Sequence, residues 1–192
     1  MKYFKKLVGE HIYLSPTNVE DAEKYTEWLN DFETTDYIGK SGYLVTLGAE
    51  KEWVENNNNN KGDNVNSRTF AIVDLERDEL IGNCGLHSID SIGRTATLGI
   101  FIGDKSCRDK GYGTEIIKIL LDYGFNYLNL NNIALTLMEF NERAYRCYQK
   151  CGFKEYGRRR KSEFVDGKYY DRIYMDILAE EFEGNFIKNK NI

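Results

Sequence analysis

Apolar residues gather in three short segments near the middle of the chain, at residues 69–73, 80–86 and 97–102. Each segment has the length and the β-branched or aromatic content that are typical of a strand. Turn-forming residues around 76–79 and 91–94 separate the segments. Because connections this short join antiparallel neighbours, the pattern predicts an antiparallel meander of three strands.

The spacing of the apolar residues changes after this meander. Apolar positions now recur three and four residues apart, which predicts a long amphipathic helix with one face turned to a core. That face consists of Ile116, Ile117, Leu120, Leu121, Gly124, Phe125 and Leu128. The apolar segment 133–137 then predicts a buried strand, and residues 142–151 predict a further helix that ends at Gly152.

The last part of the chain predicts a hairpin and a loose end. One strand begins at residue 153 and its partner covers residues 169–177, with the turn at Asp166 and Gly167. The final residues, 185–192, are expected to be frayed.

The N-terminal part of the chain predicts one strand and two helices. Residues 12–14 form the strand, and Pro16 stands where the first position of a helix is expected, directly after a serine that can cap it. That helix presents Val19, Ala22, Tyr25, Trp28 and Leu29 at helical spacing. A second helix is expected at about 47–55, and the asparagine-rich stretch 56–64 is expected to be a surface loop.

Length and composition indicate one globular unit. The chain has 192 residues, of which 41% are hydrophobic and 30% charged, so it can bury a core, which a disordered polypeptide cannot do. We expect a single domain over residues 1–192, with its core at about 9–180. No apolar run approaches the roughly 20 residues of a membrane span. The first residues lack the apolar stretch of a secretory signal.

Charge and cysteine content narrow the expected environment. The formal net charge is −5, so nothing in the composition calls for a nucleic-acid partner. Cys84, Cys107, Cys147 and Cys151 suggest reduced thiols in the cytoplasm, and their spacings fit no zinc site. The last two lie four residues apart on one helix face and are interpreted as packing residues. The basic run 158–161 is interpreted as a solvated strand end, with contact to an acidic partner as the alternative.

The segment from Arg108 to Thr114 carries the clearest candidate chemistry. It contains Gly111 and Gly113 and stands between a predicted strand and the long helix. Two glycines let backbone N–H groups approach a ligand closely, and the start of a helix adds partial positive charge, so this turn can hold a phosphate group. A glycine-rich turn without a ligand is the alternative, because a lone Gly-x-Gly is not specific.

A second block strengthens this interpretation. Asn141, Tyr148, Gly152 and Phe153 follow the glycine-rich turn, and the two blocks together resemble the GCN5-related N-acetyltransferases, the GNAT superfamily. Within that superfamily the chain looks like the branch of ribosomal-protein alanine and serine acetyltransferases, and it is also similar to spermidine acetyltransferases. The resemblance extends over residues 9–180 and includes the order of the elements.

The resemblance implies an α/β (α+β) GNAT fold, with a single mixed, mostly antiparallel sheet of about seven strands flanked by helices. At its centre, the strand 98–102 would splay away from a parallel neighbour at 133–137, and the pantetheine arm of acetyl-CoA would lie in the gap. The residues that the resemblance assigns to acetyl-CoA binding are Phe101, Ile102, Arg108, Lys110, Gly111, Tyr112, Gly113, Thr114 and Asn141.

Tyr148 is the candidate general acid. The resemblance implies that it protonates the thiolate of CoA as this leaves. A phenol with an ordinary pKa near 10 can indeed hydrogen-bond a thiolate or donate a proton to it. A single tyrosine on a helix is more often a core residue, here beside Tyr145 and Phe153, but its place in the motif favours the catalytic role.

The position of the general base departs from the family. Relatives often have Ala-Glu-Leu-Gly on the central strand, with the glutamate acting through water, whereas this chain has Thr97 at that place. Threonine can position a water but cannot take a proton at neutral pH. Other candidate bases are His87 and Glu139, while Glu33 and Asp36 are candidates for binding the acceptor or serving as the base. An amine that arrives neutral needs no base.

Together these features predict an acetyl-CoA-dependent N-acetyltransferase, an acyltransferase that transfers groups other than aminoacyl groups. The amine would attack acetyl-CoA directly in a ternary complex, and the acceptor would be a protein N-terminus or a small amine. The alternative is a non-catalytic acyl-CoA sensor with the same fold, which the missing glutamate suggests and the retained tyrosine argues against. No metal, membrane or nucleic-acid partner is expected, and the sequence leaves a homodimer open.

Overall fold

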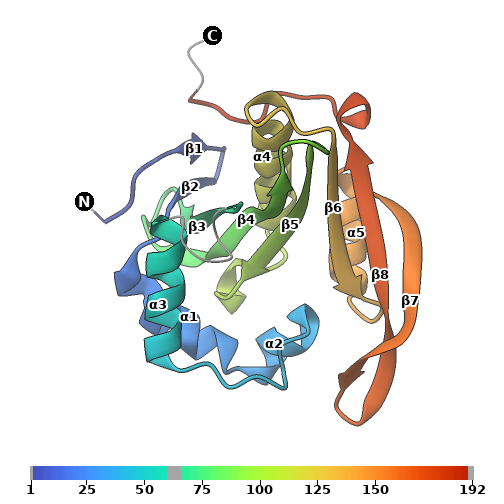
Figure 1. Ribbon diagram of the computed structural model, residues 1–192. Coiled ribbons are helices and arrows are strands. Elements are labelled where there is room, and N and C mark those ends of the chain that lie inside the picture. Colours follow the sequence, from blue (N-terminus) through green and yellow to red (C-terminus); the bar gives the residue numbers. More distant parts are fainter. Residues whose placement is uncertain (1, 60–65, 190–192) are drawn as a thin grey trace.

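One mixed sheet of eight strands organises the computed structural model, which describes residues 2–59 and 66–189 (Figure 1). Neighbouring strands follow the order β1-β2-β3-β4-β5-β6-β8-β7, and only the pair of β5 and β6 is parallel. The strands are β1 (Leu7–Val8), β2 (Ile12–Pro16), β3 (Arg68–Asp74), β4 (Leu80–Asp90), β5 (Thr95–Ile102), β6 (Asn132–Met138), β7 (Lys154–Val165) and β8 (Lys168–Leu178). The helices are α1 (Ala22–Leu29), α2 (Phe32–Ile38), α3 (Leu47–Asn58), α4 (Tyr112–Asn126) and α5 (Glu142–Lys150), with 3₁₀ turns η1 (Val19–Asp21), η3 (Lys105–Cys107) and η4 (Ala179–Glu181).

The sheet confirms the expected fold class. The meander of β3, β4 and β5, the buried strand β6 and the hairpin of β7 and β8 all form where the sequence predicts them. The expected seven strands become eight because Leu7 and Val8 form β1, a two-residue strand that pairs with β2 and is too short to show a pattern.

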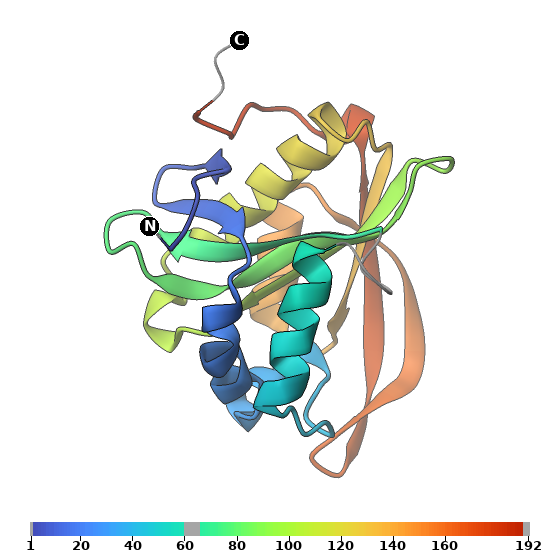
Figure 2. The same ribbon diagram turned by 60° about the vertical axis from the view of Figure 1, so that its left-hand side comes forward.

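Helices cover both faces of the sheet, with α4 and α5 on one side and α1 to α3 on the other (Figures 1 and 2). Because successive strand residues point to opposite faces, Phe70 and Ile72 of β3 enter the core beneath α4, whereas Ala71 and Val73 enter a second core beneath α1 and α3. The apolar face predicted for the long helix is buried in the first of these cores. Among the described residues, no helix is long and apolar enough to cross a membrane.

The prediction that Pro16 begins a helix was wrong. Pro16 is the last residue of β2 and pairs with Phe70, and Asn18 caps the following 3₁₀ turn by accepting a hydrogen bond from the backbone N–H of Glu20. The short strand β1 pairs with β2 only at Tyr13 and Leu14. A proline is therefore tolerated at Pro16, on a side of the strand where no neighbour needs its N–H.

Two further differences concern helices. The stretch 56–64 was expected to be a loop, but α3 continues through Asn58, whose side chain donates to the carbonyl oxygen of Thr17 at 3.0 Å. Residues 60–64 lie outside the described residues. Helix α2 was not predicted at all, because its buried residues are Thr34 and Thr35 rather than an apolar stripe.

The chain end was expected to be frayed from residue 185, which is wrong for residues 186–188. The carboxylate of Asp122, fully buried in α4, accepts hydrogen bonds from the backbone N–H groups of Phe186 at 2.7 Å and Ile187 at 3.1 Å. The N–H of Lys188 then donates to the carbonyl of Val8 at 2.7 Å. These contacts hold the tail along the first strand, and residues 190–192 lie outside the described residues.

Candidate active site

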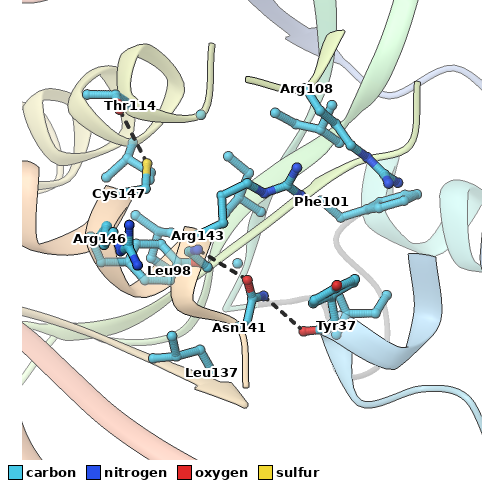
Figure 3. A pocket seen from close by; sticks show the side chains of 18 of the residues that line it. Tyr37, Leu98, Phe101, Arg108, Thr114, Leu137, Asn141, Arg143, Arg146 and Cys147 are labelled. Atoms are coloured by element: carbon cyan, nitrogen blue, oxygen red, sulfur yellow. Dashed lines mark hydrogen bonds between the residues drawn. The ribbon is translucent and has the colours of Figure 1, made fainter. Parts of the chain in front are cut away.

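A cavity of about 810 Å³ opens where β5 and β6 part (Figure 3). The two parallel strands pair only at Thr95 with Asn132, Ala96 with Ile133 and Thr97 with Ala134. Beyond these positions they diverge, as the expected fold requires. The second half of β5 forms one wall of the cavity, and α5 with the end of β6 forms the other. Backbone groups along this half of β5 are therefore available to an extended ligand.

The glycine-rich turn closes one end of the cavity at the start of α4. Gly111 is the N-cap of this helix and adopts a left-handed conformation with φ of 84°, which favours glycine. The N–H groups that follow it belong to the first helical turn, where backbone donors have no acceptor within the helix. Gly113 and Thr114 line the cavity, so the start of α4 presents these donors and its partial positive charge to a ligand there.

An acidic residue in the first turn of α4 does not compete for this site. The carboxylate of Glu115 points away and accepts hydrogen bonds from the backbone N–H groups of Glu10 at 2.6 Å and His11 at 2.9 Å. It also lies 3.0 Å from Nδ1 of His11. Its charge is thus used to hold the turn between β1 and β2 against the helix, and the anion-binding end stays free of a carboxylate from α4.

Cationic side chains surround the same end of the cavity. Arg143, Arg146 and Lys150 of α5 line it together with Arg108 of the glycine-rich turn, and Figure 3 shows the arginines around the opening. The three α5 residues were missed in the sequence, although their spacing of three and four residues places them on one helix face. This face and the start of α4 together form an anion-binding region.

Helix α2 is joined to the glycine-rich turn by ion pairs. Glu33 accepts from Nη1 of Arg108 at 3.1 Å and from Nζ of Lys105 at 2.8 Å, and Nη2 of Arg108 donates to the hydroxyl of Thr34. The hydrogen bond from Lys105 is the main reason why the pKa of Glu33 lies below its usual value. Glu33 lines the cavity as an ion-paired carboxylate, whereas Asp36 accepts a hydrogen bond from Ser41 and does not line it.

Tyr148 lies on α5, and its side chain forms part of the cavity wall while it is only 8% exposed. Its ring packs edge to face against Phe153 at a centroid distance of 5.8 Å. Burial, and next the neighbouring Cys147, raises the pKa of its phenol well above the usual value. The phenol therefore stays protonated at neutral pH and can act as a donor.

Thr97 is exposed to the cavity at the point where β5 leaves β6. His87 of β4 stands opposite Thr97 in the antiparallel register, and its ring lies over Gly85 and Gly99, where a Cβ would come within 3.1 and 3.2 Å of the imidazole. Burial, and next the nearby Lys40, lowers the pKa of His87, so the imidazole is neutral at neutral pH. It does not line the cavity itself.

The remaining candidate residues divide between the cavity and its surroundings. Asn141 lines the cavity and caps α5, accepting from the N–H of Ala144 at 3.1 Å. Tyr112 does not line it, because its hydroxyl donates to Asp74. Glu139 also lies outside the lining and accepts from the backbone N–H of Asp171 at 2.9 Å. Of the residues assigned to the cofactor, the lining includes Phe101, Ile102, Arg108, Gly111, Gly113, Thr114 and Asn141, and it leaves out Lys110 and Tyr112.

The fold and this arrangement have counterparts in known proteins. A family model described as an acetyltransferase (GNAT) domain matches residues 11–154, which is most of the chain. The chain belongs to the GNAT acetyltransferase family. Its relatives and structural neighbours are N-acetyltransferases, so this GNAT protein is an enzyme of that class.

Three comparisons place this GNAT chain among its relatives. It is 28% identical over 178 residues to the N-acetyltransferase p20 of Bacillus licheniformis, covering 93% of this chain and 98% of p20. It is 35% identical over 115 residues to a spermidine N(1)-acetyltransferase of Vibrio cholerae, covering 60% of this chain and 65% of that protein. A crystal structure of the Vibrio cholerae spermidine N-acetyltransferase with CoA and spermine superposes with a TM-score of 0.79 at 29% identity, covering 89% of this chain and 97% of that one.

Proposed function

We propose that this chain transfers the acetyl group of acetyl-CoA to a primary amine, which attacks directly while both substrates are bound. The observation that carries the proposal is one cavity with the donors of an anion site at one end and the buried phenol of Tyr148 in its wall. A structural neighbour binds CoA, which supports the choice of acetyl donor. We further propose that residues 1–192 form one such domain.

The anion-binding end fits the phosphates of CoA. The first-turn N–H groups at Gly113 and Thr114, with Arg108 nearby, would hold the pyrophosphate. The cations Arg143 and Arg146 on α5 would compensate further negative charge. From this end the cavity continues between β5 and β6, where Phe101 and Ile102 face an extended arm and free strand backbone can pair with its amides.

Acetyl-CoA supplies a thioester, whose carbonyl carbon the amine nitrogen attacks while the carbon–sulfur bond breaks. Backbone N–H groups of β5 beside the gap would stabilise the negative charge that develops on the carbonyl oxygen. The phenol of Tyr148, which is protonated at neutral pH, would donate its hydrogen to the leaving sulfur. The amine loses one proton in the same reaction, so the step needs an acceptor for it.

We assign no side chain of the enzyme to that proton. Thr97 cannot accept it, and Glu33 is held by Lys105 and Arg108. Glu139 lies outside the cavity lining, and His87 lies beneath it between two glycines. The amine would therefore bind in its neutral form and release its proton to water held at Thr97.

A screen of acceptor amines with detection of free CoA thiol tests the function. The panel contains peptides with different N-termini, polyamines including spermidine, amino sugars and aminoglycosides. Thiol release that depends on one amine class supports the proposal and names the acceptor, either a protein N-terminus or a small amine. Tight binding of acetyl-CoA in calorimetry without release for any amine would instead indicate an acyl-CoA sensor, the reading that the threonine at position 97 suggests.

A further inference from the structure

Two cysteines meet at the anion-binding end of the cavity. Cys147 lies on α5 and Cys151, one turn later, is the C-cap of this helix; the thiol of Cys151 donates to the carbonyl oxygen of Thr114 at 3.8 Å. Sγ of Cys147 lies 3.3 Å from the hydroxyl oxygen of Thr114 in the first turn of α4 (Figure 3). A Cβ at Gly113 would lie 3.6 Å from the same sulfur. The thiol of Cys147 thus touches the turn that presents backbone donors to an anion.

The surroundings of Cys147 favour its thiolate. The neighbouring Cys151 thiol contributes most to lowering the pKa of Cys147, followed by the hydroxyl of Thr114 and by the charges of Lys150 and Arg143, while burial opposes them. The partial positive charge at the start of α4 acts in the same direction. Groups that suit a phosphate therefore also stabilise a sulfur anion.

Cys147 differs from the other cysteines in its access to solvent. It is half-buried and lines the cavity, whereas Cys84, Cys107 and Cys151 are at most 7% exposed. Burial is also the main cause that raises the pKa of Cys84 and Cys107. The neighbouring Cys147, and next burial, raise the pKa of Cys151, whose thiol donates to the carbonyl oxygen of Thr114. Only one of the four, then, combines access with thiolate character.

We propose that Cys147 is a thiol modification site, where exchange with a small anionic disulfide such as glutathione disulfide blocks the phosphate end of the cavity. The Cys147 thiolate attacks one sulfur of the disulfide, a bond forms between the two sulfurs, and the other half leaves as a thiolate. Arg143 and Arg146 form exposed ion pairs with Asp109 and Glu142, and carboxylates of the reagent can compete for these cations. The added disulfide is itself the oxidant, so the exchange balances without a further oxidant or a metal.

The modification would compete with acetyl-CoA, and this consequence rests on the proposed function. A glutathionyl group on Cys147 occupies the space in front of Gly113 and Thr114 and brings two carboxylates to the cations of α5. The phosphates of the cofactor need the same space and the same charges. Reduction of the mixed disulfide by an added thiol would restore binding.

The test treats the full chain with glutathione disulfide and follows the adduct by intact mass and peptide mapping. We expect one glutathionyl group, on Cys147, that does not form in Cys147→Ser and that dithiothreitol removes. The rate should reach half of its maximum at a pH below the ordinary thiol pKa of about 8.5. In the matched variant Cys151→Ala, which removes the neighbouring thiol and keeps Cys147, this midpoint should move up.

Acetyl-CoA at ten times its dissociation constant should slow the modification about tenfold, because it leaves about a tenth of the sites free. An adduct on another cysteine, an internal disulfide of Cys147 with Cys151, or a rate with the pH midpoint of a free thiol would overturn the assignment. Calorimetry with acetyl-CoA is run separately on the reduced protein. Absence of binding there refutes the proposed function while the thiol reactivity is still measured.

Discussion

At the scale of single residues, burial decides what Tyr148 can contribute. Its phenol lies within the cavity wall at 8% exposure and packs against Phe153, and burial raises its pKa; like any phenol it is protonated at neutral pH and can donate a hydrogen bond. A donor that meets the sulfur as it gains negative charge stabilises the transition state more than the bound substrate.

We therefore expect Tyr148→Phe, which keeps the ring and removes only the hydroxyl, to lower kcat by roughly 10²–10⁴-fold, the range typical of general acids. The KM for acetyl-CoA should change little, because the lost interaction belongs to the transition state. Steady-state kinetics with the acceptor found in the screen measures both. An unchanged kcat would mean that the tyrosine only packs against Phe153.

Gly113 offers a second test, of the anion site. A Cβ at this position meets only Sγ of Cys147 at 3.6 Å, an ordinary contact, so Gly113→Ala is tolerated sterically. Gly113→Asp adds negative charge where the pyrophosphate would lie. We expect at least tenfold weaker binding of acetyl-CoA in calorimetry for the aspartate, about 1.4 kcal/mol, and a much smaller change for the alanine. Equal affinity of the aspartate variant and the parent protein would refute the assignment.

The proton lost by the amine can be traced through pH profiles. Because burial lowers the pKa of His87, a rate that depended on this base would rise below pH 6.5, its usual value. We expect instead that the rising limb of kcat/KM follows the pKa of each acceptor, and that His87→Gln leaves it in place. Thr97→Val should reduce the rate modestly without removing a limb.

A limb that keeps one pKa for acceptors of different basicity would contradict this expectation. If His87→Gln abolished that limb, the histidine would be the base. If the limb survived at lower pH, a carboxylate such as Glu139 would be indicated.

The sequence pointed to the glycine-rich turn and Tyr148 as candidate site residues because both belong to short motifs with fixed spacing, and both line the cavity. It did not reach the ion pairs of Glu33 with Lys105 and Arg108, since these join residues more than 70 positions apart. It placed His87 at the end of a strand, where a side chain could face solvent. In the structure His87 lies within β4, and its ring lies over Gly85 and Gly99. This position depends on how β4 pairs with β5, which the local sequence pattern does not show.

At the scale of elements, the contact between α4 and the chain end combines two distant segments. Asp122 is a charged residue on the buried side of a largely apolar helix, and its carboxylate is satisfied by the N–H groups of Phe186 and Ile187 and by the side chain of Asn126. The segment 185–192 was expected to be frayed because the last residues of a domain are often poorly ordered. Only the tertiary structure shows the carboxylate that orders it.

Replacing Asp122 with alanine should lower the free energy of unfolding by about 1–3 kcal/mol, because buried N–H groups lose their acceptor. Urea denaturation monitored by circular dichroism measures the change. As a matched control, a chain shortened to end at Glu183 lacks these N–H groups. In that shortened chain, Asp122→Ala should change the free energy of unfolding by a different amount. Strictly additive effects of the two changes would show that the tail contact contributes nothing.

At the scale of the whole molecule, the two cores share one sheet. Trp28 and Trp53 pack against the core beneath α1 and α3, while α4 packs on the opposite face. Strand β3 contributes to both cores through alternate residues. If the helices on one face of the sheet unfold, that face is exposed to water, and the sheet no longer supports the helices on its other face.

We expect the two tryptophans and the far-ultraviolet circular dichroism to report a single, coincident unfolding transition. Acetyl-CoA at 100 times its dissociation constant should add about 2.7 kcal/mol to the free energy of unfolding and raise Tm. Two separate transitions would instead show that the layer of α1 to α3 unfolds independently, and the single domain proposed for residues 1–192 would be wrong.

The bond between Asp122 and the tail also bears on how the chain folds during its synthesis. The ribosome releases α4 long before residues 186 and 187, so a nascent chain that closes its core early must bury an acid without hydrogen-bond donors from the tail. Lys188 further ties this late segment to Val8, which is synthesised long before it. These contacts therefore form only after residues 186–188 have left the ribosome. Until then, the carboxylate of Asp122 lacks the two backbone donors that it has in the native state.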